Sequence, residues 1–169
     1  IRREFRAAEG DPFNPREVRR SAERIRALGF FADAKVDAEQ GSGPDQVIVN
    51  VDVEEQPTGS LTFGVSYGPD TGVGFTAAFS ESNFLGRGQT VGLSIGTATD
   101  NKSGSLTFVE PAFLDRDLQF SFNASYSETN NQNALYDTRS AQIGFGIGFL
   151  VGENSRLQLN YNISETRIT

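Results

Sequence analysis

The stretch Ser60-Leu61-Thr62-Phe63-Gly64-Val65-Ser66-Tyr67 alternates small or polar residues with apolar residues along its whole length. A period of two is typical of a β-strand that has one apolar and one polar face. The polar members carry no charge, whereas the outward face of a soluble sheet usually holds many Lys, Glu and Arg residues. The stretch therefore predicts an amphipathic strand whose apolar face meets lipid rather than a protein core.

The same alternation recurs in six further stretches toward the C-terminus, separated by turns rich in Gly, Asn, Asp and Pro. These stretches are residues 73–80, 91–96, 106–108, 118–126, 143–149 and 157–163. Their polar faces are mostly Gly, Ser, Thr, Asn and Gln. We expect about seven antiparallel strands of a transmembrane β-barrel, in which about 9–11 tilted residues cross the membrane. The alternative is a soluble, glycine-rich β-sandwich or adhesin.

Two connections in this part are predicted by composition. Residues 100–104 (Asp-Asn-Lys-Ser-Gly) are typical of a turn, and residues 128–137 form the longest polar loop. A long loop is expected on the extracellular side of an outer-membrane barrel, where loops exceed the periplasmic turns in length.

The pattern changes character near Pro57, which predicts a boundary between residues 1–57 and residues 58–169. Before the boundary we expect two helices followed by two strands. Ile1, Phe5 and Ala8 share one face of a first helix, which Gly10 would end. The chain is mainly β overall, with a partial α+β module in front of the strands.

A second helix is predicted to begin at Asn14-Pro15, where Asn14 suits the N-cap and Glu17 the capping-box acid. Gly29 supplies its C-terminal stop. Its apolar residues follow at helical spacing: Val18, Ala22, Ile25 and Leu28. Two strands are predicted next, over residues 34–38 and 46–55.

Composition excludes several functions. The chain has no His, no Cys, 15 basic and 22 acidic residues, and a net charge of −7. Without His or Cys it lacks the commonest general base, the commonest metal ligand and a thiol nucleophile, so we expect no enzyme, no cofactor and no metal site. Its acidic balance speaks against a nucleic-acid partner. Met is also absent, so we expect the sequence to be part of a longer chain.

Several motifs, in order, resemble the POTRA-plus-barrel superfamily and, within it, the BamA family of outer-membrane assembly factors. The matching stretches are residues 1–10, 28–31 (Leu-Gly-Phe-Phe), 44–47, 53–59, 64–67, 72, 83–88 (Asn-Phe-Leu-Gly-Arg-Gly) and 111–113 (Pro-Ala-Phe). The resemblance implies the end of a last periplasmic POTRA module, followed by the first strands of a barrel of sixteen. It also implies the bacterial outer membrane as the location, with the N-terminal module in the periplasm.

The resemblance further implies a function and its partners. The family folds and inserts β-barrel proteins into the outer membrane, and its first barrel strand parts from the last as a lateral gate. Here that strand is residues 59–68, with Ser60 to Tyr67 as its gate residues. Unfolded outer-membrane proteins, periplasmic accessory lipoproteins and the lipid bilayer are the implied partners. Arg2 and Glu9 are the positions that match the lipoprotein-docking surface, and a solvated helix face is the alternative.

Two other classes of barrel are weighed against this one. An outer-membrane lipase or protease needs a nucleophile with a base, which these residues do not offer. A passive porin would not be preceded by a module of helices and strands. A secretion translocator of the same superfamily, of the two-partner secretion or TamA type, is the main alternative. Gly64 can serve either as a weak point of the gate strand or simply as a small lumen-facing residue.

Overall fold

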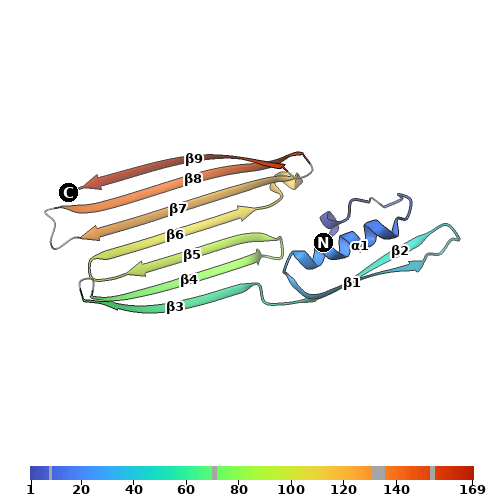
Figure 1. Ribbon diagram of the computed structural model, residues 1–169, viewed down its shortest axis with the longest axis horizontal. Helices are drawn as coiled ribbons and strands as arrows, with labels where there is room; N and C mark the ends of the chain where they lie inside the picture. The colour runs from blue at the N-terminus through green and yellow to red at the C-terminus, as the bar shows by residue number, and fades with distance from the viewer. Residues whose placement is uncertain (8, 70–71, 131–135, 153–154) are drawn as a thin grey trace. The chain divides into compact units, whose positions relative to one another are not determined.

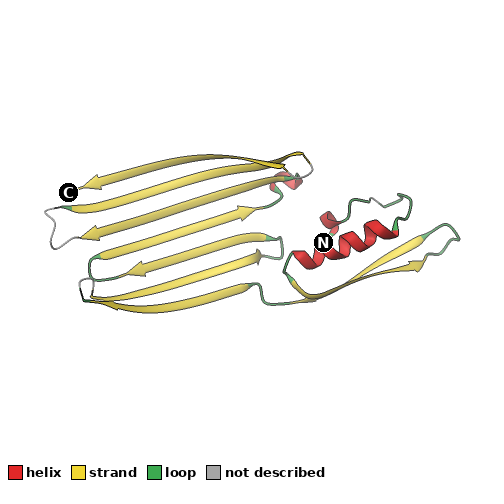
Figure 2. Cartoon of the chain, viewed as in Figure 1, coloured by secondary structure: helices red, strands yellow, loops and turns green. Residues whose placement is uncertain are grey.

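The computed structural model describes residues 1–7, 9–69, 72–130, 136–152 and 155–169. The chain forms two compact units, Ile1–Thr58 (unit 1) and Gly59–Thr169 (unit 2), each with its own sheet. Figure 2 shows helix and strand together in unit 1, and a broad sheet of long strands in unit 2. No helix in the described part of the chain is long and apolar enough to cross a membrane.

Unit 1 holds one α-helix against a two-stranded sheet (Figure 1). Its elements are the 3-10 helix η1 (Arg2–Glu4), α1 (Pro15–Ala27), β1 (Phe31–Gln40) and β2 (Val47–Glu55). β1 and β2 pair antiparallel. The predicted strands over residues 34–38 and 46–55 are confirmed, and the first of them is longer than expected.

The predicted first helix is wrong. Only Arg2–Glu4 is helical, and Phe5 is already extended at φ −91° and ψ 124°. A helix of about ten residues gains few internal hydrogen bonds for the cost of nucleation, so its formation depends on packing. Ala8, the third residue of the predicted face, lies outside the described residues.

The start of α1 follows the prediction closely. The Asn14 side chain accepts a hydrogen bond from the Arg16 backbone N–H at 3.1 Å, and Pro15 occupies the first helical position. Gly29, at φ 72°, follows the last turn as expected for a C-terminal stop. Glu17, expected as a capping-box acid, directs its carboxylate to Arg24 at 2.7 Å.

Arg24 joins α1 to the N-terminal segment. Its guanidinium donates to Glu17 and to the Ser21 hydroxyl, and its Nε donates to the Glu4 backbone carbonyl at 2.8 Å. Ser21 is fully buried, and this hydrogen bond satisfies its hydroxyl. The buried apolar core beside it is small and consists of Ile25, Ala22 and Ala34.

Unit 2 is a single antiparallel sheet of seven strands in chain order (Figure 1). Its strands are β3 (Gly59–Gly68), β4 (Gly72–Phe84), β5 (Gln89–Thr97), β6 (Asn101–Glu110), β7 (Leu118–Asn130), β8 (Asp137–Gly152) and β9 (Ser155–Ile168). A single tight turn, labelled η2 (Phe113–Asp115), lies between β6 and β7, and its Leu114 has the non-helical angles φ 57° and ψ 34°. The expectation of about seven antiparallel strands is confirmed.

The register places every apolar stretch on the same face. One row across all seven strands reads Leu61, Phe79, Leu93, Leu106, Ala124, Ile143, Ile163. The adjacent row, on the opposite face, reads Thr62, Ala78, Ser94, Ser105, Ser125, Gln142, Ser164. One face of the sheet is therefore continuously apolar, and the other is small and polar.

Charged side chains in the described strands of unit 2 lie near strand ends. One row at the end of the apolar face joins Lys102 of β6, Glu128 of β7, and Arg139 and Arg167 of β8 and β9. The middle of the apolar face is left without charge, as a surface in contact with hydrocarbon requires.

Small residues on the polar face make room for larger neighbours. A Cβ added to Gly144 of β8 would clash with the Oδ1 atoms of both Asn123 and Asn162. Because Gly144 has no side chain, the two amide side chains on either side of it have room on the polar face.

Two predicted connections differ from the structure. The turn expected at residues 100–104 ends at Asp100, because β6 begins at Asn101 and the alternation continues through Ser103 and Gly104. The loop expected over residues 128–137 is shortened at both ends by β7 and β8, and its residues 131–135 lie outside the described part.

We expect Ile25→Ala to destabilise unit 1 by about 2–5 kcal/mol, because the side chain is fully buried in a small core. Urea unfolding of the periplasmic region of the parent protein, followed by far-ultraviolet circular dichroism, measures this loss. Asp45→Asn, at the exposed β1–β2 turn, is the control and should leave the midpoint unchanged. Equal midpoints for both variants would contradict the assignment of the core.

We expect Glu17→Gln to reduce the pH dependence of unit 1 stability. The hydrogen bond from Arg24 holds the pKa of Glu17 below its ordinary value of 4.5. The folded state is therefore stabilised above pH 4.5, and this contribution is lost as the pH falls through the lowered pKa. Thermal unfolding at pH 7 and pH 3 should show a smaller acid loss for the variant. Glu23→Gln, exposed on α1, is the control and should retain the parent's acid loss.

Candidate functional site

The candidate site is β3, the first strand of the unit 2 sheet. β3 is bounded by Gly59 and Gly68, and it pairs with β4 from Gly59↔Glu81 to Gly68↔Gly72. It is first in the strand order, so its second side has no neighbouring strand among the described residues. The strand that the family resemblance implies as the gate therefore forms an edge of the sheet.

An edge strand of this kind offers backbone hydrogen-bonding groups. In an antiparallel ladder, alternate residues direct both N–H and C=O toward one neighbour, and the residues between them direct theirs to the other side. About half of the backbone groups of β3 therefore point away from β4. Such a row can accept a further strand by β-augmentation.

The apolar side chains of β3 are more exposed than those in the middle of the sheet. Exposed fractions are 73% for Phe63, 73% for Val65 and 78% for Tyr67, against 42% for Phe145 on β8. A strand with neighbours on both sides loses more surface to adjacent side chains. The high exposure of β3 therefore follows from its one open side.

Gly64 lies on the polar face of β3, opposite Thr76. A Cβ at this position would lie 2.5 Å from the Thr76 hydroxyl oxygen, which a rotation of the Thr76 side chain would relieve. The contact fits a small lumen-facing residue. It does not decide whether Gly64 also weakens the strand for opening, so this role stays a prediction.

The opposite edge of the sheet is formed by β9. It pairs with β8 from Thr138↔Ile168 to Gly152↔Ser155 and, among the described residues, has no strand beyond it. β9 is therefore the second edge of the unit 2 sheet. The alternating sequence pattern of β9 is the same as that of β3, and sequence reasoning did not single it out.

Arg2 and Glu9, the predicted docking residues, lie together in unit 1. The Arg2 guanidinium donates to the Glu9 carboxylate, and the two side chains are 86% and 87% exposed. An ion pair with this exposure contributes little to stability. The pair can therefore change partner at low cost, although its role in docking stays a prediction.

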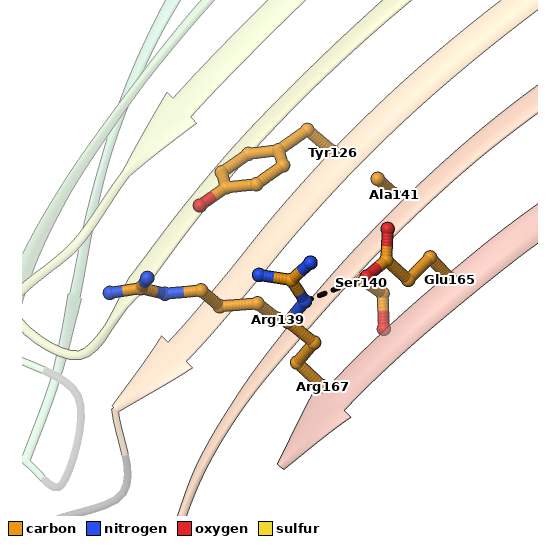
Figure 3. Close-up of a pocket in the computed structure, with 6 residues that line it drawn as sticks. All are labelled: Tyr126, Arg139, Ser140, Ala141, Glu165 and Arg167. Atoms are coloured by element: carbon orange, nitrogen blue, oxygen red, sulfur yellow. Dashed lines mark hydrogen bonds and ion pairs between the residues drawn. The ribbon is translucent and has the colours of Figure 1, made fainter. Parts of the chain in front are cut away.

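A polar cluster at the outer ends of β7, β8 and β9 borders a cavity of about 300 Å³ (Figure 3). Arg167 donates to Glu165 at 2.6 Å, and the Tyr126 hydroxyl donates to Glu128 at 2.7 Å. Arg139 lies 3.5 Å from the same Glu128 carboxylate. Sequence reasoning missed this cluster, although charges at the ends of neighbouring predicted strands could have indicated it.

The chemistry of this cluster is that of paired charges. Each of its two acids has an arginine within ion-pair distance, so neither resembles a carboxylate poised for acid–base catalysis. Within the described residues no group of three or more acidic side chains is placed to hold a metal ion.

Comparison with known proteins decides the family. The Omp85 superfamily domain matches residues 83–169, which is more than half of the chain. This chain belongs to the Omp85 superfamily. Residues 1–56 match the POTRA family, whose description is surface antigen variable number repeat. Unit 1 is thus a POTRA module, and unit 2 is part of an Omp85 barrel that these seven strands do not close.

Similar sequences within the Omp85 superfamily are named outer membrane protein assembly factor BamA. The protein of Neisseria meningitidis serogroup B is 27% identical over 173 residues, covering 100% of this chain and 22% of its own length. That of Nitratidesulfovibrio vulgaris is 30% identical over 161 residues, covering 93% and 20%. The chain therefore spans less than a third of the curated relatives it matches.

Two solved structures resemble the chain. BamA from Haemophilus ducreyi lacking POTRA domains 1-3 has a TM-score of 0.78 and 27% identity, covering 99% of this chain and 32% of that one. CdiB from Acinetobacter baumannii has a TM-score of 0.62 and 12% identity, covering 98% and 35%, and shows the fold alone. The location is the bacterial outer membrane, with the POTRA module in the periplasm.

The location orients the sheet. β3 begins at Gly59, directly after the POTRA module, so this end of the sheet is periplasmic. The connections around residues 84–88 and 111–117 lie at the same end, because the register pairs Gly59 with Glu81, Phe84 with Gln89, Thr90 with Val109 and Glu110 with Phe120. The continuous apolar face is the lipid-facing surface, and the small polar face lines the lumen.

Proposed function

We propose that the full-length protein folds β-barrel proteins and inserts them into the bacterial outer membrane by templating strands at a lateral gate. The observation that carries this proposal is the open side of β3, where about half of the backbone groups lack a neighbouring strand in unit 2. Unfolded outer-membrane proteins are the proposed clients. The names of the sequence relatives, which are outer membrane protein assembly factors, support the same activity.

The physical need for such a template comes from the bilayer. A client strand that enters hydrocarbon must pair every N–H and C=O, because each unpaired group there costs several kcal/mol. The outward groups of β3 can receive one client strand in a defined register. Its apolar side chains Phe63, Val65 and Tyr67 already face lipid, so a strand added beside them continues the same surface.

β3 rather than β9 is proposed as the gate because of its place in the chain. In the family that the chain resembles, the gate lies between the first and last barrel strands. β3 is the first strand after the POTRA module. We propose that β9 pairs permanently with the strand that follows it in the longer protein, whereas the contact of β3 with the last strand opens.

A secretion translocator of the two-partner secretion or TamA type is the alternative. It would use the same unit 2 sheet as the wall of a pore, without adding client strands at β3. The 27–30% identity to assembly factors over most of the chain favours assembly. The likeness to CdiB, at 12% identity, concerns the fold and does not discriminate between the two.

We also propose that the exposed Arg2–Glu9 pair contributes to a docking surface for a periplasmic accessory lipoprotein. The pair supplies both charges at a site where neither is buried. A partner with complementary charges could bind there without desolvating a group of the POTRA core.

We expect a disulfide that joins β3 to the last barrel strand to abolish assisted client folding. The experiment uses the full-length parent in liposomes with its accessory lipoproteins, with Thr62→Cys and a facing cysteine in the last strand. Client folding is followed by heat-modifiable gel mobility. Reduction of the disulfide should restore the rate.

The matched control locks β3 to its other neighbour. Thr62→Cys with Ala78→Cys joins two register partners on the lumen face and leaves the open side of β3 free. This variant should assist folding at the parent rate. Clients that fold no faster with the parent than in empty liposomes would instead indicate a secretion pore. Full activity of the β3–last-strand lock would contradict the gate.

We expect the charge swap Arg2→Glu with Glu9→Arg to release the accessory lipoprotein. The swapped pair keeps its own attraction, so thermal unfolding of the POTRA module should not change, whereas the surface presented to a partner is reversed. Co-purification from membranes measures retention of the lipoprotein. Arg19→Glu, exposed on α1, is the control. Retention by the swapped variant would identify the pair as a solvated surface without a docking role.

A further inference from the structure

Two periplasmic turns of unit 2 share a sequence pattern. The β4–β5 connection reads Glu81-Ser82-Asn83-Phe84-Leu85-Gly86-Arg87, and the β6–β7 connection reads Glu110-Pro111-Ala112-Phe113-Leu114-Asp115-Arg116. Both fit the pattern Glu-x-x-Phe-Leu-x-Arg. The two hairpins are neighbours in the sheet, so the repeated turns lie at the same end.

The two turns also share their hydrogen bonds. In the first, the Arg87 N–H donates to the Phe84 carbonyl at 3.2 Å, and the Glu81 carboxylate accepts from the Asn83 N–H at 2.8 Å. The second turn repeats both bonds at equivalent positions. There, Arg116 donates to Phe113 at 3.3 Å, and Glu110 accepts from Ala112 at 3.0 Å. The repeated sequence therefore builds a repeated structure.

A leucine occupies a left-handed backbone conformation in each turn. Leu85 has φ 55° and Leu114 has φ 57°, and the next residue also has positive φ in both turns. Two consecutive positive φ values, closed by the bond from Arg to Phe, define a type I′ turn, which prefers Asn or Gly at its first central position. Leucine is strained there.

The strained leucines are also exposed. Leu85 is 75% and Leu114 is 71% exposed, so neither packs into the protein. Turn geometry alone would select Asn or Gly, and a water-facing turn would not favour Leu. An apolar side chain that is held outward at both turns against the local preference indicates a contact outside the protein.

The surroundings of the turns indicate lipid. Phe113 stacks on Phe120 of β7 with ring centroids 5.1 Å apart, and Phe120 belongs to the lipid-facing surface. The second turn therefore continues that surface at its periplasmic end. Gln89 donates to Glu110 at 2.5 Å and so joins the first hairpin to the second.

We propose that these two turns are a membrane anchor, in which Leu85 and Leu114 insert into the periplasmic leaflet of the outer membrane. The two leucines contact the region of the phospholipid layer in which the head groups meet the acyl chains. Arg87, flanked by Gly86 and Gly88, is free of adjacent acids in sequence and contacts the lipid phosphate. Arg116 lies between Asp115 and Asp117, so only the leucine contact is assigned to the second turn. The anchor rests on the location of unit 2 and not on the proposed gate.

The experiment places a fluorescent probe on the full-length parent, with any native cysteines replaced, in phosphatidylethanolamine–phosphatidylglycerol vesicles. Leu85→Cys and Leu114→Cys carry an environment-sensitive label, which is tested with doxyl-lipid and aqueous iodide quenchers. Leu159→Cys on the lipid-facing side of β9 is the membrane control, and Ser42→Cys in the β1–β2 turn is the water control. We expect both turn labels to be quenched by the lipid probe, as at Leu159. Quenching by iodide, as at Ser42, would overturn the proposal, and so would shielding from both quenchers, which would indicate a protein partner.

A second variant separates the anchor from a purely structural turn. Leu85→Asn with Leu114→Asn suits the left-handed positions, so the barrel should keep its heat-modifiable mobility. In vesicles we expect faster amide hydrogen exchange at residues 84–88 and 113–117 than in the parent. Unchanged or slower exchange would show that the leucines serve the turn alone. Client folding in the same vesicles reports on the proposed gate separately.

Discussion

The need to pair every backbone N–H and C=O in hydrocarbon is the constraint on which the structure of unit 2 depends. It explains why the seven strands form one continuous ladder in chain order, with each strand except β3 and β9 paired on both sides. It also explains the register, since a shift of one residue would turn the row of Leu61, Phe79 and Leu93 toward the lumen. The two open edges are the places where this constraint is not yet met by unit 2 itself.

The same constraint explains how much of the fold could be predicted from the sequence. A barrel strand has lipid on one face and a small polar lumen on the other, so alternation alone indicated all seven strands, including residues 60–67 of β3. Prediction failed where alternation carried no information. Residues 101–104 resemble a turn in composition but continue the ladder, because Lys102 lies at the charged outer end of β6. The segment from Ile1 to Gly10 has a helical pattern, but its described residues form only η1, because so short a helix gains few hydrogen bonds.

Less of the candidate site could be predicted from the sequence. The pattern of Ser60 to Tyr67 matches that of the other strands, so the edge position of β3 came from the family resemblance and not from its residues. The repeated Glu-x-x-Phe-Leu-x-Arg turns were present in the sequence, but their meaning depended on backbone angles. A leucine at positive φ cannot be recognised from residue type, because leucine is rarely found there.

The proposed exchange at β3 also follows from pairing energetics. β3 has ten residues, of which alternate ones point outward, so about ten backbone hydrogen bonds can join it to a closing strand. Opening that seam into lipid without a replacement would leave all of these groups unpaired, at several kcal/mol each. Replacing the closing strand with a client strand keeps their number nearly constant. A gate in such a barrel therefore works by exchange of strands. The lumen face of β3 is polar and uncharged, so it places little restriction on the sequence of the client strand that pairs with it.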